Sequence, residues 1–396
     1  MARKLHLSFF LLLQFLFFNQ AFAYNQGCQS NCEQGSSEKS ASNVQQRLVG
    51  YYPAAGHDAG CLGMDFDSIP AERFTHLNFA FGRINSQSFE IEPAEGLNTD
   101  AFSNLTSLKN KSTKLKAMIS LTDSRFGPNN RSVFSNMISS RANRQKFIER
   151  LTPFMGRYCF DGVDFDWEYP GEARGSDDDG VNYTQLLKEL RDTMKGYVVS
   201  FTAPTPLVYL RHFDLRNMMQ YVDFVNFMAY DIHGVWDRDP DSAVGNHIYA
   251  HTNLTEIKDA LDILWRADVP RGKVNLGLAF YGNSYTLENS SCSRPGCPFK
   301  DGGTPGPCSG ASGVLIYKEI VDIINTNNIK PVHDTKAAVK YITWNADQWV
   351  AYDDPETLQQ KIRFGNEQGL GGLFIWAINQ DVKDRSALRG VLAKSA

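Results

Sequence analysis

Short apolar runs alternate with amphipathic stretches along most of the chain. Eight of these runs have the length and the β-branched and aromatic content of buried strands. They cover residues 48–53, 74–81, 115–120, 160–167, 197–203, 223–230, 274–280 and 372–378. The intervening stretches with the clearest helical periodicity are residues 141–155, 182–194, 254–267 and 355–368. Apolar strands separated by helices indicate a parallel sheet whose faces are covered by helices.

The number of predicted strands favours a closed barrel. Eight parallel strands joined by helices close into a (β/α)8 TIM barrel, and an open doubly wound sheet is the competing topology. The open sheet is disfavoured because no glycine-rich dinucleotide loop follows the first run, LVGYYP (48–53). The interval between the seventh and eighth runs is too long for one helix. We therefore predict an α/β fold in which residues 47–396 form the barrel, with a small α+β insertion at about residues 283–350.

One apolar run, FDGVDFDWEYP (Phe160–Pro170), carries a row of acids. Asp164, Asp166 and Glu168 alternate with apolar residues, which is the period of a β-strand. As the fourth barrel strand, this run would point its acids into the barrel, about 6.6 Å apart. The row would rise toward the carboxyl-terminal rim, where such barrels have their active sites. Burying even one unpaired carboxylate costs several kcal/mol, so three in a row predict a functional site.

A surface strand or a calcium loop is the structural alternative for the acidic row. Val163, Phe165 and Trp167 on the opposite face argue against a strand that faces solvent, because a parallel barrel strand is buried on both faces. A calcium-binding loop would place its glycine and its last glutamate at different positions. Inward-facing acids therefore remain the preferred interpretation.

The first residues have the layout of a secretory signal peptide. Two basic residues precede an apolar run, residues 5–18, and small residues lead to a cleavage site after Ala23. The apolar run is short for a membrane span, and an uncleaved anchor is the alternative. We expect a secreted, extracellular protein with a signal peptide over residues 1–23, a polar linker over residues 24–46 and no membrane contact after cleavage.

An oxidising compartment changes how the cysteines are interpreted. The seven cysteines are Cys28, Cys32, Cys61, Cys159, Cys292, Cys297 and Cys308. Most of them are expected to pair, although the sequence leaves the connectivity open. The last three predict a disulfide staple in a loop-rich insertion, with a zinc site as the alternative. Six glycosylation sequons, which fit a secreted surface, begin at Asn104, Asn110, Asn130, Asn182, Asn253 and Asn289.

The composition argues against two classes of partner. The formal net charge is only −4 and no basic run occurs, so the chain has no general attraction for nucleic acid or for anionic membranes. No motif for a metal or an organic cofactor stands out, and we expect neither to be required. We also expect the protein to be a monomer.

The acidic row also carries a family resemblance. Asp161, Asp164, Asp166 and Glu168 match the DxxDxDxE motif of family-18 glycoside hydrolases, the chitinases and their relatives. The resemblance covers nearly the whole chain after Arg47. Its other segments are LVGYYP (48–53), THLNFAF (75–81), NFMAYDIHGVWD (226–237), LGLAFYG (276–282) and GLGGLFIWAINQD (369–381).

Two regions refine this resemblance. Residues 251–282, with CSRPGCPF and GPCSG behind them, are most similar to fungal chitinases related to killer-toxin subunits. GCQSNC (27–32) resembles the tail of a hevein-type chitin-binding module. Such a module is a disulfide scaffold that needs more cysteines than the two present here, so we interpret this segment as a remnant.

The resemblance implies a substrate-assisted, retaining hydrolysis of a glycosidic bond. Glu168 would protonate the glycosidic oxygen, for which the pKa of its carboxyl must be raised. Asp166 would orient the acetamido group of the sugar, whose carbonyl oxygen is the nucleophile. Asp164 would share a proton with Asp166. Tyr230 would contact the acetamido oxygen and join these acids as a catalytic residue.

The resemblance also implies a substrate-binding surface. Asp231 would contact the sugar, and the Trp376 indole would form the floor under the reacting ring. Further pocket-lining positions are Tyr51, Phe81, Met228 and Tyr281. Asp161 has the wrong parity to face the cavity, so we expect it to hold backbone structure.

Three segments depart from the family pattern. On the third strand, ISLTDS (119–124) replaces the usual Ser-X-Gly-Gly, and bulkier side chains there would reshape the cavity floor. Asn283 replaces an arginine, which removes a bidentate donor near the sugars. PAAGHD (53–58) lacks the usual tryptophan and hence one sugar platform. We expect these changes to alter affinity and turnover more than the type of reaction.

The resemblance therefore implies a secreted chitinase that acts within polymers of β-1,4-linked N-acetylglucosamine, with chitin or chito-oligosaccharides as its partner. Two alternatives remain open. An endo-β-N-acetylglucosaminidase that acts on N-glycans uses similar acids, and a chitin-binding lectin of this family lacks turnover. Such lectins typically lose one of the motif acids, whereas this chain retains all of them from Asp161 to Glu168.

Overall fold

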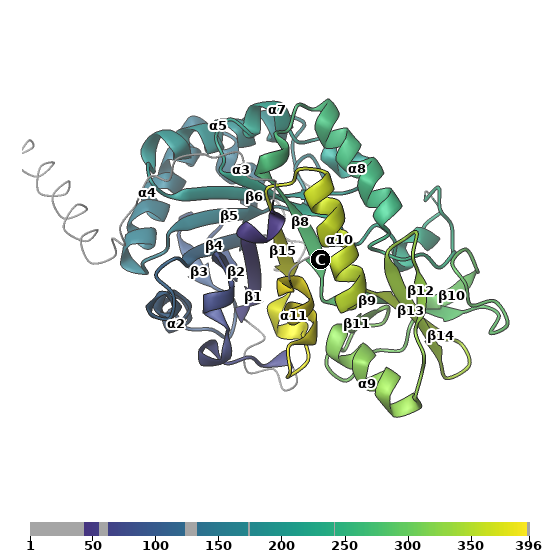
Figure 1. The fold of residues 1–396 in the computed structure, drawn as a ribbon. Helices are drawn as coiled ribbons and strands as arrows, with labels where there is room; N and C mark the ends of the chain where they lie inside the picture. The colour runs from purple at the N-terminus through teal and green to yellow at the C-terminus, as the bar shows by residue number, and fades with distance from the viewer. Residues whose placement is uncertain (1–42, 55–61, 123–132, 173–174, 241, 394–396) are drawn as a thin grey trace, which may run out of the picture.

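The computed structural model describes residues 43–54, 62–122, 133–172, 175–240 and 242–393. The described residues form a barrel surrounded by helices, with a smaller sheet at its side (Figure 1). Several predictions fall outside the described ranges. They concern the signal peptide, most of the linker, the hevein-like segment, Cys28, Cys32, Cys61, Asn130 and residues 55–58 of the segment after the first strand.

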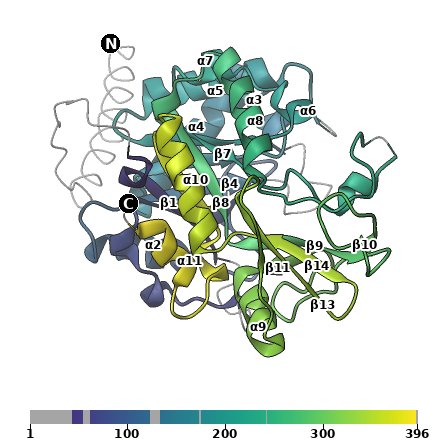
Figure 2. The same ribbon diagram turned by 45° about the vertical axis from the view of Figure 1, so that its right-hand side comes forward.

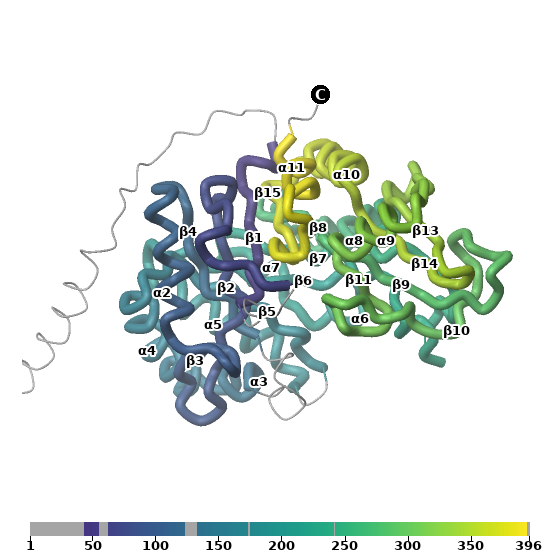
Figure 3. The backbone as a smooth tube through the Cα atoms, turned by 90° about the horizontal axis from the view of Figure 1, so that it is seen from below, coloured from purple at the N-terminus to yellow at the C-terminus, as the bar shows by residue number. Residues whose placement is uncertain are grey.

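Eight parallel strands form the closed barrel that the sequence predicts. They are β1 (Leu48–Pro53), β2 (His76–Ile84), β4 (Lys116–Thr122), β5 (Gly162–Asp166), β6 (Val198–Pro204), β7 (Phe224–Met228), β8 (Val274–Ala279) and β15 (Gly372–Trp376). Each strand pairs with the next in this order, and β15 pairs with β1, so the sheet closes on itself. Figure 3 shows β1 and β15 side by side, in the colours of the two ends of the chain. A short strand, β3 (Ile91–Pro93), adds to β2 in antiparallel direction.

Several strands end earlier than predicted. The predicted sixth strand, 223–230, ends at Met228, and the predicted eighth strand, 372–378, ends at Trp376. The fourth strand ends at Asp166, so Glu168 follows this strand instead of lying on it. The hydrophobic pattern does not show where these strands end, because residues that follow a strand can be apolar without belonging to it. Tyr230, for example, lies past β7 and lines a cavity at the barrel rim.

Helices cover the outside of the barrel. They are α2 (Asp100–Ser107), α3 (Val133–Ile138), α4 (Arg141–Arg157), α5 (Asp179–Thr193), α6 (Leu207–Leu210), α7 (Leu215–Met218), α8 (Leu254–Arg266), α10 (Pro355–Glu367) and α11 (Ser386–Leu392). The predicted helices correspond to α4, α5, α8 and α10. Ser140, Asn253 and Asp354 start three of them, because each side chain accepts a backbone N–H of the first turn. Within the described ranges, no helix has the length and apolarity needed to cross a bilayer.

The acidic strand β5 packs its apolar face under these helices, as predicted. Phe165 and Trp167 are buried, and the Phe134 ring of α3 stacks on Trp167 with the ring centroids 5.4 Å apart. Tyr183 of α5 packs edge-on against both side chains. Burying a large apolar side chain contributes about 1.5–3 kcal/mol. This packing fixes the parity of β5, so its acids face the barrel interior.

An antiparallel sheet and one helix form the insertion between β8 and β15. Its elements are β9 (Tyr281–Leu287), β10 (Phe299–Gly302), β11 (Val314–Ile316), α9 (Tyr317–Asn327), β12 (Val332–Asp334), β13 (Val339–Trp344) and β14 (Gln348–Tyr352). The strand order is β10-β9-β14-β13-β12, and β11 pairs with β9. The insertion projects from one side of the barrel (Figures 1 and 2). It spans residues 281–352, slightly more than the predicted 283–350.

The end of the predicted linker belongs to the folded unit. Val44–Gln46 form a short 3-10 helix, and Val44 is fully buried. The Val44 N–H donates to Asn366 Oδ1 of α10 at 2.9 Å. The linker prediction was therefore wrong for these residues, because the Val44 side chain and hydrogen bonds from Val44 and Gln45 attach them to the folded unit.

Candidate active site

A cavity of about 720 Å³, which we call the main cavity, opens at the carboxyl-terminal ends of the barrel strands. Seven of the predicted site residues line it: Tyr51, Asp166, Glu168, Met228, Tyr230, Asp231 and Trp376. The other three lie behind its wall. Asp164 is buried one inward position below Asp166, Phe81 stacks on Trp376, and Tyr281 packs edge-on against Tyr230.

Asp164 is fully buried and is bound by donors from four different strands. The Tyr51 hydroxyl and the Ser120 hydroxyl each donate to Oδ2 at 2.7 Å. Ser200 Oγ donates to Oδ1 at 2.6 Å, and Asn226 Nδ2 donates to the same oxygen at 3.2 Å. Burial raises the pKa of Asp164, and these hydrogen bonds act in the opposite direction. Each carboxylate oxygen thus has two partners, which makes the buried charge tolerable.

The hydrogen bonds around Asp164 continue toward the amino-terminal end of the barrel. Asn226 Nδ2 also donates to the Tyr51 hydroxyl at 2.8 Å. Asn275 Nδ2 donates to Asn226 Oδ1 at 2.8 Å, and Arg47 Nε donates to Asn275 Oδ1 at 2.7 Å. A chain of polar side chains therefore runs through the barrel and orients the group that holds Asp164.

Asp166 and Glu168 carry the acidic row into the main cavity. Asp166 is nearly buried, and its Oδ1 accepts the Thr202 hydroxyl at 2.7 Å. Glu168 follows the end of β5 and is half-buried at the rim. Because Asp164 and Asp166 are inward residues of β5 and Glu168 continues their alternation, the three carboxyl groups rise in order from the interior to the cavity.

Three carboxylates surround the Tyr230 side chain. Burial raises the pKa of Tyr230 well above its ordinary value, and the charges of Asp166, Asp231 and Glu168 raise it further. The phenol therefore stays protonated at neutral pH and is able to donate a hydrogen bond. Tyr230 thus adds a neutral donor to an otherwise acidic group of side chains.

Aromatic rings form one wall of the main cavity. Trp376 stacks on Phe81 with the ring centroids 5.5 Å apart and an angle of 23° between the rings. It also meets the Tyr51 ring edge-on at 5.8 Å. Trp376 is partly exposed, whereas Tyr51 and Phe81 are buried behind it. The indole therefore offers a rigid, flat face to the cavity.

Hydrogen bonds with neighbouring residues hold Asp231 in place. Its φ of 54° lies in the left-handed region, which is uncommon for an aspartate. Its N–H donates to His251 Nδ1 at 3.3 Å, and His251 Nε2 then donates to the Tyr281 carbonyl oxygen at 3.2 Å. Asn283 Nδ2 donates to Asp231 Oδ1 at 3.2 Å. These bonds fix a carboxylate at the edge of the main cavity.

A family model described as glycosyl hydrolases family 18 matches residues 47–381. The chain belongs to this family. The match covers all eight barrel strands and the insertion, and it confirms the predicted family.

Similar proteins agree with this assignment. Killer toxin subunits alpha/beta of Kluyveromyces lactis are 32% identical over 363 residues, which are 89% of this chain and 30% of the relative. Secreted chitinase LysM12 of Penicillium expansum is 29% identical, over 94% of this chain and 26% of the relative. This chain thus spans less than a third of the length of either relative. The Group IV chitinase of Ostrinia furnacalis has a solved structure that matches with a TM-score of 0.78 and 26% identity, over 87% of this chain and 98% of that one.

The altered third strand of this family-18 chain adds side-chain volume beside the acids. β4 and β5 pair in register so that Ser120 lies beside Asp164 and Thr122 lies beside Asp166. Thr122 is buried and occupies the position of the first family glycine. Asp123, which replaces the second glycine, lies outside the described residues.

Asn283, which replaces the family arginine, forms its hydrogen bonds within the protein. Its Nδ2 donates to Asp231 Oδ1 and also to the His233 carbonyl oxygen, the latter at 2.8 Å. Asn283 is buried and is not among the residues that line the main cavity. Asn283 is shorter than arginine but still supplies a hydrogen-bond donor. It donates to Asp231 from a buried position outside the main cavity.

Three aromatic residues that the sequence analysis missed also line the main cavity. Tyr169 and Tyr209 stack with the ring centroids 4.4 Å apart. Trp236 is 49% exposed, which is unusual for so large an apolar side chain. Each of them lies shortly after the carboxyl end of a barrel strand. This position is the signal that could have identified them, because active sites of such barrels are built from these loops.

Asp161 holds backbone structure, as predicted. Its Oδ2 accepts the Ala117 N–H at 2.8 Å, and its Oδ1 lies 3.2 Å from Lys109 Nζ. Lys109 Nζ also donates to the Cys159 carbonyl oxygen. Asp161 therefore joins β4 to the start of β5 and does not face the main cavity.

The cysteines of the insertion are oxidised. Cys292 and Cys297 form a disulfide, which contradicts a zinc site made from this group. Cys159 and Cys308 are also disulfide-bonded. Across the described ranges, no group of three or more His, Cys, Asp or Glu side chains is arranged to hold a metal ion.

Proposed function

We propose that this protein is a secreted chitinase that cleaves within chains of β-1,4-linked N-acetylglucosamine. The observation that carries the proposal is the row of acids from Asp164 through Asp166 to Glu168, which leads into a cavity walled by the Trp376 indole. Family membership and the similarity to proteins named as chitinases support the substrate class.

Glu168 is the general acid in this mechanism. Its proton goes to the glycosidic oxygen as the bond between that oxygen and the anomeric carbon breaks. The acetamido carbonyl oxygen of the same sugar forms a new bond to the anomeric carbon, which gives an oxazolinium ion. The Glu168 carboxylate then takes a proton from water, and this water opens the ring with retention of configuration. The substrate supplies the nucleophile, so the protein needs none.

Asp166 and Asp164 stabilise the acetamido group as it becomes positive. The Thr202 hydroxyl fixes the orientation of the Asp166 carboxyl group beside the reacting sugar. Burial raises the pKa of Asp164, which favours a proton shared between the two aspartates. The hydroxyl partners of Asp164 are able to rotate, so their hydrogen bonds adapt to either protonation state.

Tyr230, Asp231 and Trp376 bind the reacting sugar. The Tyr230 phenol is protonated and donates to the acetamido oxygen, which positions this oxygen for attack. Asp231, fixed by Asn283, accepts a sugar hydroxyl. The Trp376 indole, supported by Phe81, packs against the apolar face of the pyranose ring.

Secretion belongs to the same proposal. The signal-peptide layout of residues 1–23 and the disulfide-bonded cysteines support an extracellular location. Among the predicted sequons, Asn104, Asn110 and Asn289 are exposed and therefore best placed to carry glycans. We further propose that the protein acts as a monomer on chitin or chito-oligosaccharides without a cofactor.

A product profile on chitohexaose tests the reaction. We expect the purified wild-type protein to release shorter oligosaccharides, detected by mass spectrometry. Glu168→Gln should lower the rate by about 10²–10⁴-fold or more, because it removes the only group assigned to proton transfer. Glu149→Gln is the matched control, since Glu149 is exposed on α4 and does not line the main cavity. Robust hydrolysis of chitohexaose by Glu168→Gln would contradict the proposed mechanism.

The same preparation separates the two alternative functions. Binding to chitin without any product from the wild-type protein would indicate a lectin. Release of N-glycans from a glycoprotein, with chitohexaose left intact, would indicate an endo-β-N-acetylglucosaminidase. Either result would contradict the proposed chitinase.

A further inference from the structure

Arg47 lies at the end of the barrel opposite the main cavity. It directly precedes β1, and its Nε donates to Asn275 Oδ1 inside the barrel at 2.7 Å. Its Nη2 donates to the Gly272 carbonyl oxygen at 2.9 Å, and the guanidinium lies over the Phe224 ring, 4.9 Å from the centroid. Three contacts thus fix a side chain that does not line the main cavity.

Two glycines leave space for the contact between Arg47 and Asn275. They stand at the start of β15, which lies between β1 and β8 (Figure 3). A Cβ on Gly371 would come within 2.3 Å of Arg47 Nη2, and a Cβ on Gly372 within 2.3 Å of Asn275 Oδ1. Neither glycine has a φ in the left-handed region, so close approach and not backbone conformation explains them. The start of β15 is therefore shaped around this contact.

The chemistry of Arg47 fixes the direction of the hydrogen bonds that follow. A guanidinium only donates, so the Asn275 atom beside it is the amide oxygen. Asn275 Nδ2 then has to donate, and it meets Asn226 Oδ1 at 2.8 Å. Asn226 Nδ2 in turn becomes a donor to Asp164 Oδ1, at 3.2 Å. We call Arg47, Asn275 and Asn226 the relay, and both of its asparagines are fully buried.

The relay also fixes the Tyr51 hydroxyl. The Tyr51 oxygen accepts the Asn226 N–H at 2.8 Å, which leaves its own hydrogen for Asp164 Oδ2 at 2.7 Å. Of the four partners of Asp164, only Ser120 and Ser200 are then able to turn and act as acceptors. The other two have to donate, and donors stabilise a carboxylate relative to the protonated acid. The relay thus favours the charged form of Asp164.

We propose that Arg47 is a positioning residue for the catalytic acids and acts through the relay from the far end of the barrel. It holds Asn226 as a donor, so that Asp164 remains the charged member of the aspartate pair. The proton of the pair is thereby directed to Asp166, which lines the main cavity. The consequence for catalysis rests on the proposed function, whereas the direction of the hydrogen bonds does not.

The charged groups around Arg47 leave it able to act only as a donor. Burial lowers the pKa of Arg47 to about 10, and Asp223 opposes this change, so the guanidinium is charged at neutral pH. Burial, Arg47 and Lys116 lower the pKa of His76 to about 4, so this imidazole is neutral there. Lys273 is a further cation close enough to respond to Arg47.

The groups around Asp164 leave Asp166 as the partner for the proton. Burial and the charges of the two aspartates raise the pKa values of Tyr51 and Tyr183 well above the ordinary value, so both phenols stay protonated. Burial also raises the pKa of Asp164, and its hydrogen bonds oppose this change. Losing a fixed donor should therefore make Asp164 easier to protonate.

Asn275→Leu breaks the relay without changing any charge. The aspartate pair needs one negative charge to stabilise the acetamido group, so a second proton should stop hydrolysis. We expect the acid limb of kcat on chitohexaose to move about one pH unit higher, because Asp164 gains this proton more easily. The basic limb, assigned to Glu168, and the KM should not change, since Asn275 does not line the main cavity. An acid limb that stays in place would overturn the proposal.

A double-mutant cycle separates the relay from the field of a distant charge. Arg47→Met should move the acid limb as Asn275→Leu does, and the double variant should move it no further. Arg47→Lys retains a group that only donates and should return the limb most of the way. Arg271→Met removes an exposed cation just before β8 and is the matched control, which should leave the limb unchanged. Additive shifts in the double variant would show that Arg47 acts by its charge alone, against the proposal.

A titration of Asp164 tests the relay apart from His76 and from any hydrolysis. In protein labelled with ¹³C at the aspartate carboxyl groups, the Asp164 signal is the one that Asp164→Asn removes. We expect its titration midpoint to rise by about one pH unit in Asn275→Leu, or in the half-buried Arg47→Met if the first variant does not fold. A constant midpoint would refute the role of Arg47 even in an active enzyme. The expected rise in a protein that leaves chitohexaose intact would contradict the proposed function alone.

Discussion

Asp164 depends on donors that reach it from four strands of the barrel. A buried carboxylate that loses one donor keeps the desolvation penalty but has fewer interactions to offset it. The contact with Ser200 is the shortest of the four, with 2.6 Å between Ser200 Oγ and Asp164 Oδ1. Ser200 is itself fully buried, so water is not expected to replace its hydroxyl.

Ser200→Ala should therefore lower the free energy of unfolding by about 1–3 kcal/mol. Urea denaturation at pH 7 measures this difference. Ser103→Ala, on the exposed surface of α2, is the matched control and should stay within about 0.5 kcal/mol of the wild type. Equal stabilities of the two variants would show that the Ser200 hydroxyl does not stabilise the buried charge.

At the residue scale, the acidic row could be identified from the sequence, but the residues that donate hydrogen bonds to it could not. Asp164, Asp166 and Glu168 could be identified because carboxylates at every second position are rare in an apolar strand. Ser200 and Asn226 could not, because a single small polar residue in a strand is common. Their roles depend on which inward residues meet across the barrel, and this is set by the register of strands that are distant in sequence.

At the scale of elements, the segment that follows β7 is connected to α8 through one histidine. His233 Nδ1 lies 2.9 Å from Asp237 Oδ2 on the same segment, and its Nε2 lies 2.8 Å from Glu256 Oε1 in the first turn of α8. Burial lowers the pKa of His233, but the hydrogen bonds with the two carboxylates outweigh burial and raise the pKa to about 9. The Tyr249 ring packs against the imidazole with the centroids 5.0 Å apart.

The stabilisation from His233 should depend on pH. Its folded-state pKa of about 9 lies above the ordinary 6.5, so the contribution is complete below about pH 6.5 and is lost as the pH rises through 9. We expect the loss of stability caused by His233→Gln to be larger at pH 6 than at pH 10 by roughly 2–3 kcal/mol. Urea denaturation at both pH values measures the two differences.

His247→Gln provides the control for this pH dependence. The His247 ring meets the Val244 carbonyl oxygen, and so its replacement should have an effect that changes little between pH 6 and pH 10. A stability difference for His233→Gln that stays constant over this range would contradict a charged imidazole stabilised by its two carboxylates. Because Asp231 and Trp236 lie on the same segment, the proposed chitinase activity should also fall above pH 9 in the wild type.

The limits of individual elements were less predictable than their order. Apolar content extends past β7 and β15 because residues such as Tyr230 and Ile378 form cavity walls, and a hydrophobic run does not distinguish a wall from a strand. The linker was extended too far for a related reason. This segment is attached by one buried apolar residue, Val44, and by hydrogen bonds of Val44 and Gln45, and one apolar residue makes no periodic pattern.

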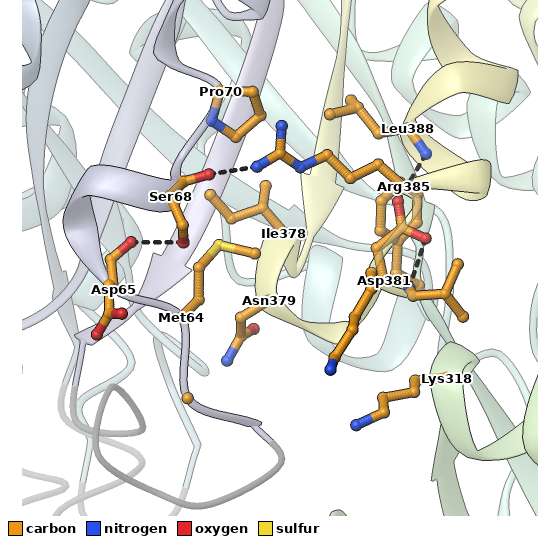
Figure 4. Close-up of a pocket in the computed structure, with 14 residues that line it drawn as sticks. Met64, Asp65, Ser68, Pro70, Lys318, Ile378, Asn379, Asp381, Arg385 and Leu388 are labelled. Carbon is orange, nitrogen blue, oxygen red and sulfur yellow. Dashed lines mark hydrogen bonds between the residues drawn. The ribbon is translucent and has the colours of Figure 1, made fainter.

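At the scale of the whole molecule, the barrel and its insertion could be predicted because eight apolar runs and one over-long interval are features of the entire chain. A cavity of about 320 Å³ outside the candidate active site (Figure 4) could not, because it forms where residues 63–70, 378–388, Phe280 and Lys318 meet. None of these segments has an unusual composition by itself. Only the folded arrangement brings them together.

A buried ion pair connects the insertion to the barrel. Lys361 of α10 and Asp353, which directly follows β14, have side chains that are each 1% exposed. Lys361 Nζ also donates to the Ala338 carbonyl oxygen at 2.7 Å, and Thr357 Oγ1 donates to Asp353 Oδ1 at 2.8 Å. Burial lowers the pKa of Lys361, and the charge of Asp353 opposes this change. The pair thus couples α10 to the start of β13 and to the end of β14, which lie side by side.

Lys361→Met should lower the free energy of unfolding by about 3–5 kcal/mol, because it leaves the Asp353 carboxylate buried without its partner. The double variant Lys361→Met/Asp353→Leu should recover most of this loss, since neither charge then remains. Native-state hydrogen exchange locates the effect: in Lys361→Met, amides of β13 should exchange before those of β5, whereas in the wild type both should require global unfolding. Simultaneous exchange of the two strands in Lys361→Met would show that other contacts between β8, β9 and α10 already unite the insertion and the barrel.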